Sequence, residues 1–114
     1  MPSKRKDTAR QAERRGPPFH LKFTEVAEHA LAALKADAAL MKRHKAVLTS
    51  LAYLETNPKH PSLHTHEFTS KKGPNKEKVF EAYAQNKTPG AFRIFFFYGP
   101  AGDEITILAI TAHP

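Results

Sequence analysis

Three apolar segments near the C-terminal end of the chain constrain its fold more than any other feature. They cover residues 79–84, 91–98 and 104–111 and are rich in aromatic and β-branched side chains. Gly, Pro, Asn and Asp gather in the connections between them, at 85–90 and 99–103. Such segments are typical of β-strands, and short connections favour antiparallel neighbours. The sequence therefore predicts an antiparallel meander of three strands.

The middle segment contains a single charged residue, Arg93. This segment is the most apolar of the three, so we expect a central strand that is buried on both faces. A guanidinium buried without a partner is costly. Arg93 therefore needs either a structural partner, such as a cross-strand pair with Glu81, or a function. Phe95 and Phe97 suit either the core or a stacking surface for bases.

One short strand and two helices are expected on the N-terminal side of these segments. Residues 19–23 alternate between apolar and polar side chains, which is the period of a half-buried strand. Thr24 can cap a helix that extends to about residue 36, and a second helix is expected from about 38 to 56, before Pro58. We expect the two helices to pack on the sheet through Leu31, Leu34, Val47, Leu48, Leu51 and Leu54.

Residues 59–78 are predicted to be a linking segment between the helices and the three strands. They are polar and rich in His and Lys, and Leu63 and Phe68 can anchor them to the core. The predicted fold class is α+β, in the order β-α-α-β-β-β, with a helical hairpin packed on one face of a mainly antiparallel sheet.

Composition limits the chemistry and the partners. A chain of 114 residues suffices for one domain, and its formal net charge of +7 favours polyanionic partners, either nucleic acid or an acidic protein. The absence of Cys excludes disulfides and thiolate metal sites. We find neither a membrane-spanning segment nor a signal peptide, and so we expect a cytoplasmic protein without a membrane partner.

The N-terminal segment differs in character from the rest. Residues 1–16 are basic and have no periodic apolar face, so we interpret them as a disordered tail. Gly16, Pro17 and Pro18 then break the chain, which predicts a folded domain over residues 17–114. The composition of the tail fits both a segment that binds a polyanion and one that only adds solubility.

The order of these elements and several local segments resemble the RelE/ParE toxin superfamily of type II toxin–antitoxin systems. The likeness is to its RelE-, YoeB- and HigB-like mRNA interferase branch and covers about residues 19–114. It rests on the loop at 57–66 and on the strand segments at 79–83, 92–94 and 107–113. An arginine in the middle strand and a histidine that ends the last strand agree with this branch.

The resemblance implies a RelE/ParE-like fold and a toxin that acts as a metal-independent, ribosome-dependent mRNA endoribonuclease and so inhibits translation. It also implies a cognate antitoxin, mRNA and the ribosome as partners, and no cofactor. Arg93 matches the strand arginine credited with stabilising phosphate. His113 matches the terminal histidine of YoeB-like members, and Glu67 lies where those members carry a carboxylate.

RNA cleavage of this kind needs three chemical groups. The ribose 2′-hydroxyl attacks the adjacent phosphorus, so a base, a cation for the developing charge and an acid for the leaving 5′-oxygen are required. Glu67 or a loop histidine is the candidate base, Arg93 the cation and His113 the acid. The candidate RNA-binding residues are Lys71, Lys72, Lys76, Lys78, His64, His66 and Tyr83.

Other interpretations of the same residues stay open. The lysines also fit a solvated loop, and the alternative function is a non-enzymatic module of the same fold. Such a module would be either a ParE-like DNA gyrase inhibitor or an inactive RNA-binding relative. His60, His64 and His66 could offer three imidazoles to Zn²⁺, but without Cys or carboxylates at a known spacing we predict no metal site.

Overall fold

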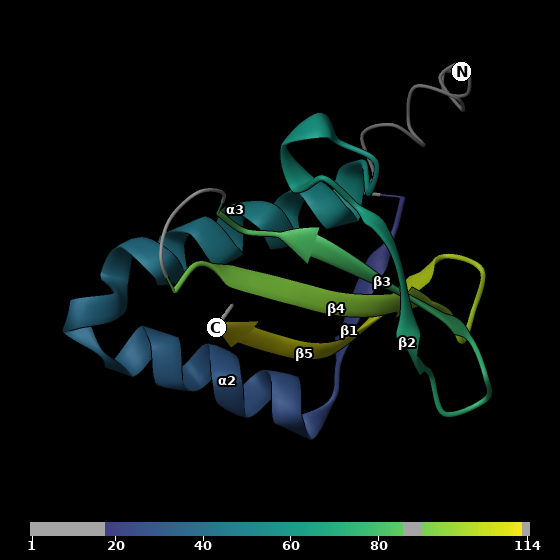
Figure 1. The fold of residues 1–114 in the computed structure, drawn as a ribbon, viewed down its shortest axis with the longest axis horizontal. Coiled ribbons are helices and arrows are strands. Elements are labelled where there is room, and N and C mark those ends of the chain that lie inside the picture. The colour runs from purple at the N-terminus through teal and green to yellow at the C-terminus, as the bar shows by residue number, and fades with distance from the viewer. Residues whose placement is uncertain (1–17, 86–89, 113–114) are drawn as a thin grey trace, which may run out of the picture.

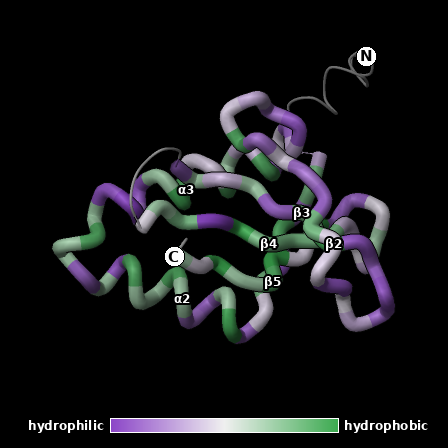
Figure 2. Tube along the Cα trace, viewed as in Figure 1, coloured by the Kyte–Doolittle hydropathy of each residue, from purple (hydrophilic) through white to green (hydrophobic). Residues whose placement is uncertain are grey.

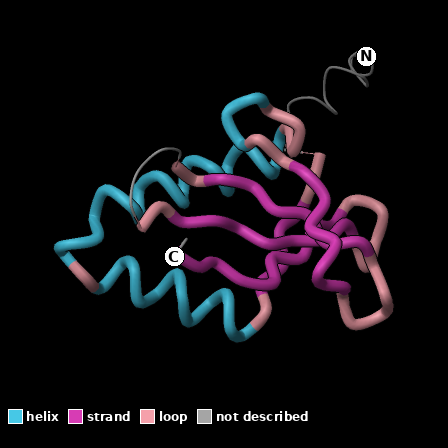
Figure 3. Tube along the Cα trace, in the orientation of Figure 1, coloured by secondary structure: helices cyan, strands magenta, loops and turns pink. Residues whose placement is uncertain are grey.

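The structure is a computed structural model that describes residues 18–85 and 90–112. The tail predicted over residues 1–16 and the candidate acid His113 lie outside the described residues. Within the described residues, two helices follow a first strand, and four further strands come after the helices (Figures 1 and 3). The elements are β1 (His20–Phe23), α2 (Glu25–Ala36), α3 (Met41–Thr56), β2 (His66–Lys72), β3 (Lys78–Tyr83), β4 (Phe92–Tyr98) and β5 (Glu104–Ala112), with short 3-10 turns at Ala38–Leu40 and Pro61–Leu63.

The five strands form one mixed sheet in the order β1-β5-β4-β3-β2. β1 runs parallel to β5, and every other neighbouring pair is antiparallel. β4, the most apolar segment, is therefore the central strand. The predicted α+β architecture, with a helical hairpin on a mainly antiparallel sheet, is confirmed.

The prediction that residues 59–78 are only a linking segment is wrong in part, because these residues contain β2. This strand forms an edge of the sheet, and its pairing with β3 is irregular between Glu67 and Lys72. Phe68 is its only apolar residue, so the alternation that identifies a half-buried strand is missing. An edge strand pairs through its backbone on one side and needs little apolar surface.

β2 also covers part of the sheet face that the helices leave free. In Figure 1 it crosses in front of the other strands. Phe68 reaches past β3 to contact Phe95 of β4, with 4.9 Å between the ring centroids. Val79 and Phe97 are buried on this same face. We call this face of the sheet the β2 side and the opposite face the helix side.

The helix side holds the main hydrophobic core. α2 packs along β5 and α3 along β4, and apolar residues along both helices and the central strands appear in green in Figure 2. Four of the six residues predicted for this contact are buried and Leu31 packs against the core, but Leu48 is 45% exposed. The residues at the centre of the core are Ala27, Leu34, Val47, Leu51, Leu54, Ile94, Phe96, Ile107 and Ile110.

The prediction for Leu48 was wrong because of helical phase. Val47, Leu51 and Leu54 recur at spacings of four and three residues and form one stripe. Leu48 lies about 100° further round the helix than Val47, which turns it away from the sheet. Thr24 fixes the start of α2, since its Oγ1 accepts from the Ala27 N–H and donates to the Leu108 carbonyl of β5.

Candidate functional site

Strand register brings a set of polar side chains together on the β2 side. In β3, Phe80 and Ala82 pack toward the helices, so Glu81 and Tyr83 point to the other face. Tyr83 lies opposite Arg93 of β4 in the register. His66 of β2 lies opposite Glu81 on the other flank of β3. We call the group formed by His64, His66, Glu81, Tyr83 and Arg93 the Arg93 cluster.

Glu81 is the partner that Arg93 requires. The Arg93 Nη1 donates to Glu81 Oε2 at 2.5 Å, and the guanidinium carbon lies 4.8 Å from the centroid of the Tyr83 ring. Glu81 is 2% exposed, whereas the Arg93 side chain is 24% exposed. Among the described residues, Nη1 is the guanidinium nitrogen that makes a hydrogen bond. The remaining donors of the planar fork are therefore available to a phosphate.

His66 binds the same carboxylate from the other side. Its Nε2 lies 2.8 Å from Glu81 Oε1, and its Nδ1 lies 2.8 Å from the His64 carbonyl oxygen. A carbonyl and a carboxylate both only accept hydrogen bonds, so a ring nitrogen donates in either contact only when it carries a proton. The buried carboxylate of Glu81 is thus contacted by Arg93 from one side and by His66 from the other.

Aromatic contacts complete the cluster. The His66 ring meets the Tyr83 ring edge-on at 5.7 Å, and the His64 ring is tilted against Tyr83 at 6.0 Å. His64 has a positive φ of 48° as the C-terminal cap of the turn Pro61–Leu63. This conformation aims the imidazole of an exposed loop residue at the cluster. A cationic fork beside aromatic rings can bind both the phosphate and the base of a nucleotide.

The structure brings four of the residues predicted for the site together: Arg93, Tyr83, His64 and His66. It does not bring Glu67 to them. Glu67 lies opposite Phe80 in the register, and directly opposed residues share a face. Glu67 is therefore exposed on the helix side of β2, away from Arg93. The sequence had raised Glu81 only as a structural partner.

The four candidate lysines lie at the other end of β3. Lys72 pairs with Lys78 where β2 and β3 meet their connecting turn, and Lys76 has a positive φ in that turn. Lys71, Lys72, Lys76 and Lys78 are all exposed. Lys78 lies five positions before Tyr83 along β3, which is about 17 Å. The lysines therefore form a separate basic tip and not part of the Arg93 cluster.

The three loop histidines do not converge on one point. His60 stacks on Tyr53 with 3.9 Å between ring centroids, and its Nδ1 accepts from the Ser62 N–H. Within residues 18–85 and 90–112, no group of three or more His, Cys, Asp and Glu side chains could hold a metal ion. No helix in the same residues is long and apolar enough to cross a membrane.

Comparison with known proteins identifies the fold. No protein-family model matches the sequence, and no curated protein matches it. Among solved structures, a chain of the archaeal RelE–RelB complex from Pyrococcus horikoshii OT3 matches with a TM-score of 0.56. The match covers 83% of this chain and 94% of that chain, at 14% sequence identity.

The chain has a RelE-like fold. At this level of identity the likeness concerns the fold alone. Within the RelE-like fold, the hairpin of α2 and α3 occupies one face of the sheet. The other face carries the Arg93 cluster at the end of the sheet that β2 leaves accessible.

Proposed function

We propose that the chain is a toxin of a toxin–antitoxin system, with residues 17–114 as the toxin domain and residues 1–16 as a basic tail. Support comes from the RelE-like fold, whose matching structure is a RelE–RelB complex. By analogy, a cognate antitoxin is the proposed protein partner. The proposed activity is cleavage of mRNA on the ribosome without a metal ion, which inhibits translation in the cytoplasm.

The observation that carries the activity is the partly exposed guanidinium of Arg93 beside the Tyr83 ring and the buried Glu81. Glu81 holds the guanidinium in place through Nη1 and leaves the rest of the fork for a phosphate. A partly exposed guanidinium beside aromatic rings suits a single-stranded RNA.

The proposed reaction is transfer of the phosphoryl group within the RNA. The 2′-oxygen bonds to phosphorus and loses its proton to a base, while the bond to the 5′-oxygen breaks and that oxygen takes a proton from an acid. Arg93 stabilises the charge on the phosphorane oxygens. His64, an exposed imidazole beside Tyr83, replaces Glu67 as our candidate base. His113, the residue directly after β5, stays the candidate acid.

The test is mRNA cleavage on purified ribosomes. Arg93→Ala should slow cleavage by about 10²–10³-fold, because one preorganised cation at the phosphorane is lost. Arg93→Lys should restore little, since a point charge does not reproduce the planar fork. His113→Gln should slow cleavage by about 10²–10⁴-fold. Lys45→Ala, on the exposed surface of α3, is the control and should cut as the parent does.

Circular dichroism and antitoxin binding must show that each variant still folds. If Arg93→Ala cleaves mRNA at the rate of the parent, the active site lies elsewhere in the protein. The lysine tip should add salt-dependent affinity for the RNA backbone through Lys71, Lys72, Lys76 and Lys78.

The ion pair with Glu81 also favours a second candidate. A buried carboxylate that already neutralises Arg93 suits a structural role, and the protein would then be a non-enzymatic module of the same fold. Expression in a bacterial host separates the possibilities. An RNA-cleaving toxin stops translation first, a ParE-like gyrase inhibitor damages DNA first, and an inactive RNA-binding relative does neither.

A further inference from the structure

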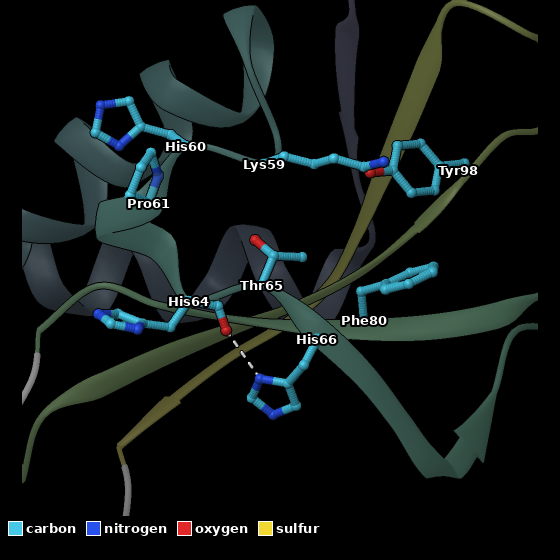
Figure 4. Close-up of a pocket in the computed structure, with 8 residues that line it drawn as sticks. All are labelled: Lys59, His60, Pro61, His64, Thr65, His66, Phe80 and Tyr98. Atoms are coloured by element: carbon cyan, nitrogen blue, oxygen red, sulfur yellow. Dashed lines mark hydrogen bonds between the residues drawn. The ribbon is translucent and has the colours of Figure 1, made fainter.

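Two adjoining hollows open where the loop after α3 meets the ends of β3 and β4. The first is about 350 Å³ and the second about 520 Å³. Both are lined by Lys59, Phe80 and Tyr98, and Figure 4 shows these residues around the first hollow. Binding sites for small ligands have volumes of roughly 300–1,000 Å³. We call the two together the Tyr98 hollow.

One wall of the hollow is a fixed aromatic surface. The Tyr98 ring lies 5.9 Å from Phe19, 5.4 Å from Phe80 and 5.7 Å from Phe96 between centroids. Three rings therefore hold Tyr98 in position, yet 38% of the residue stays exposed. A ring that is held and also accessible is a platform on which a planar base can stack at little cost in entropy.

The other wall supplies positive charge. Lys59 is exposed, and in Figure 4 its side chain extends across the hollow in the direction of Tyr98. Among the described residues that line either part of the hollow, none is acidic. An apolar side chain from a protein partner would need the rings but not the cation. A nucleotide uses both, because its base is planar and its phosphate is an anion.

The hollow also adjoins the Arg93 cluster at the edge of the sheet. His64 and His66 line the first hollow, and both also contact Tyr83 in the cluster. A single strand bound at Arg93 can therefore pass over these two histidines and reach Lys59. Phe80 and Glu81 are consecutive residues of β3 and point to opposite faces of the sheet. Phe80 faces the hollow and Glu81 belongs to the Arg93 cluster, so the two sites are separated only by the edge of the sheet.

We propose that the Tyr98 hollow binds one unpaired nucleotide, with its base stacked on Tyr98 and its phosphate at Lys59. The site accepts the nucleotide moiety, whether free or part of a single strand. Its role as a subsite next to the point of RNA cleavage rests on the proposed function. The binding itself does not depend on cleavage.

Binding is tested on the full chain with two probes. One is free AMP, followed by NMR chemical shifts, and the other is a short single-stranded RNA with one 2-aminopurine, whose fluorescence falls on stacking. Tyr98→Leu keeps an apolar side chain but removes the ring, and should weaken binding by about 5- to 100-fold. Tyr98→Phe should bind as the parent does and controls for folding.

The charge is tested with a matched pair of variants. Lys59→Glu should weaken both probes about tenfold or more, because it reverses the charge at the phosphate. Lys45→Glu changes the net charge equally, but Lys45 lies near the N-terminal end of α3. It is about 20 Å along the helix axis from the loop that carries Lys59. Lys45→Glu should change the affinity by about twofold or less.

The outcomes separate this proposal from the proposed function. If Lys59→Glu and Tyr98→Leu bind both probes with the affinity of the parent, the proposed nucleotide site is wrong. It is also wrong if the parent binds neither probe. Equal weakening by Lys45→Glu would leave only non-specific attraction and would also overturn it. Probe binding at Tyr98 without any mRNA cleavage would support the site while the proposed endoribonuclease fails.

Discussion

The two faces of the sheet are built on different principles. On the helix side, aliphatic and aromatic residues from two helices and the central strands are fully buried in one continuous core. On the β2 side, the edge strand β2 crosses the sheet, and Val79 and Phe97 are buried. Beyond these residues lies the Arg93 cluster, in which charged and aromatic side chains satisfy one another. One face therefore supplies stability, and the other holds polar groups in a fixed geometry.

The comparison explains why the candidate site lies where it does. A carboxylate at the depth of Glu81 is tolerated only with partners, and Arg93 and His66 provide them from two different strands. Because the helix side already stabilises the domain, the β2 side can keep part of Arg93 exposed. The sheet of this chain thus holds a partly exposed guanidinium on its central strand.

The largest expected effect compares two adjacent phenylalanines of β4. Phe96 is fully buried on the helix side, whereas Phe95 is half-buried on the β2 side against Phe68. Phe96→Ala should lower the free energy of unfolding by about 3–5 kcal/mol, because it opens a cavity in the main core. Phe95→Ala should cost about half as much or less, since its ring is partly solvated already.

Urea denaturation of both variants measures the difference. Leu48→Ala serves as the control on the helices, and its exposed side chain should change the free energy by about 0.5 kcal/mol or less. Equal losses for Phe95→Ala and Phe96→Ala would mean that the β2 side is as much a core as the helix side. The distinction between the two faces would then be wrong.

The second expected effect compares the stability contributed by two carboxylates on opposite faces of the sheet, Glu81 and Glu67. Glu81→Gln removes the charge that Arg93 and His66 share, and should lower the free energy of unfolding by about 1–3 kcal/mol. Glu67→Gln is the matched control, because Glu67 is exposed on the other face. It should change the free energy by about 0.5 kcal/mol or less. The reverse order of the two losses would contradict the observed register.

These two carboxylates also show how far the sequence could predict the site. Apolar periodicity predicted the helices and β1, and apolar segments rich in aromatic and β-branched residues, with turn residues between them, predicted β3, β4 and β5. The apolar pattern of β4 also identified Arg93 as a charge in need of a partner. These patterns could not choose between Glu67 and Glu81, since a shift of one residue in the pairing exchanges the faces of a strand.

β2 is the element that the sequence pattern predicts least well. Its segment is polar, so no burial pattern fixes its register or even its presence. The contacts of His66 with Glu81 and of Phe68 with Phe95 link residues far apart in the sequence. Only the folded sheet relates them. The prediction for His113 stays untested, because that residue lies outside the described part of the chain.

The smallest expected effect is on the pH dependence of stability and concerns Tyr98. This residue lies at the edge of the helix side and is partly exposed. Burial raises the pKa of the Tyr98 phenol above its ordinary value, because the phenolate is desolvated there. The native state thus holds this proton more tightly than the unfolded state. The free energy of unfolding should therefore fall as the pH rises through about 10, the ordinary pKa of tyrosine, and above it.

Absorbance at the phenolate band, recorded for the native parent and for Tyr98→Phe, isolates this step by difference. The step should have its midpoint above that of the urea-unfolded chain, and the parent should lose more thermal stability than Tyr98→Phe between neutral and strongly alkaline pH. A midpoint at or below the unfolded value would mean that Tyr98 is as well solvated as a free side chain. The phenol would then not be desolvated at this rim, and the contrast between a packed helix side and an open β2 side would be wrong at this edge.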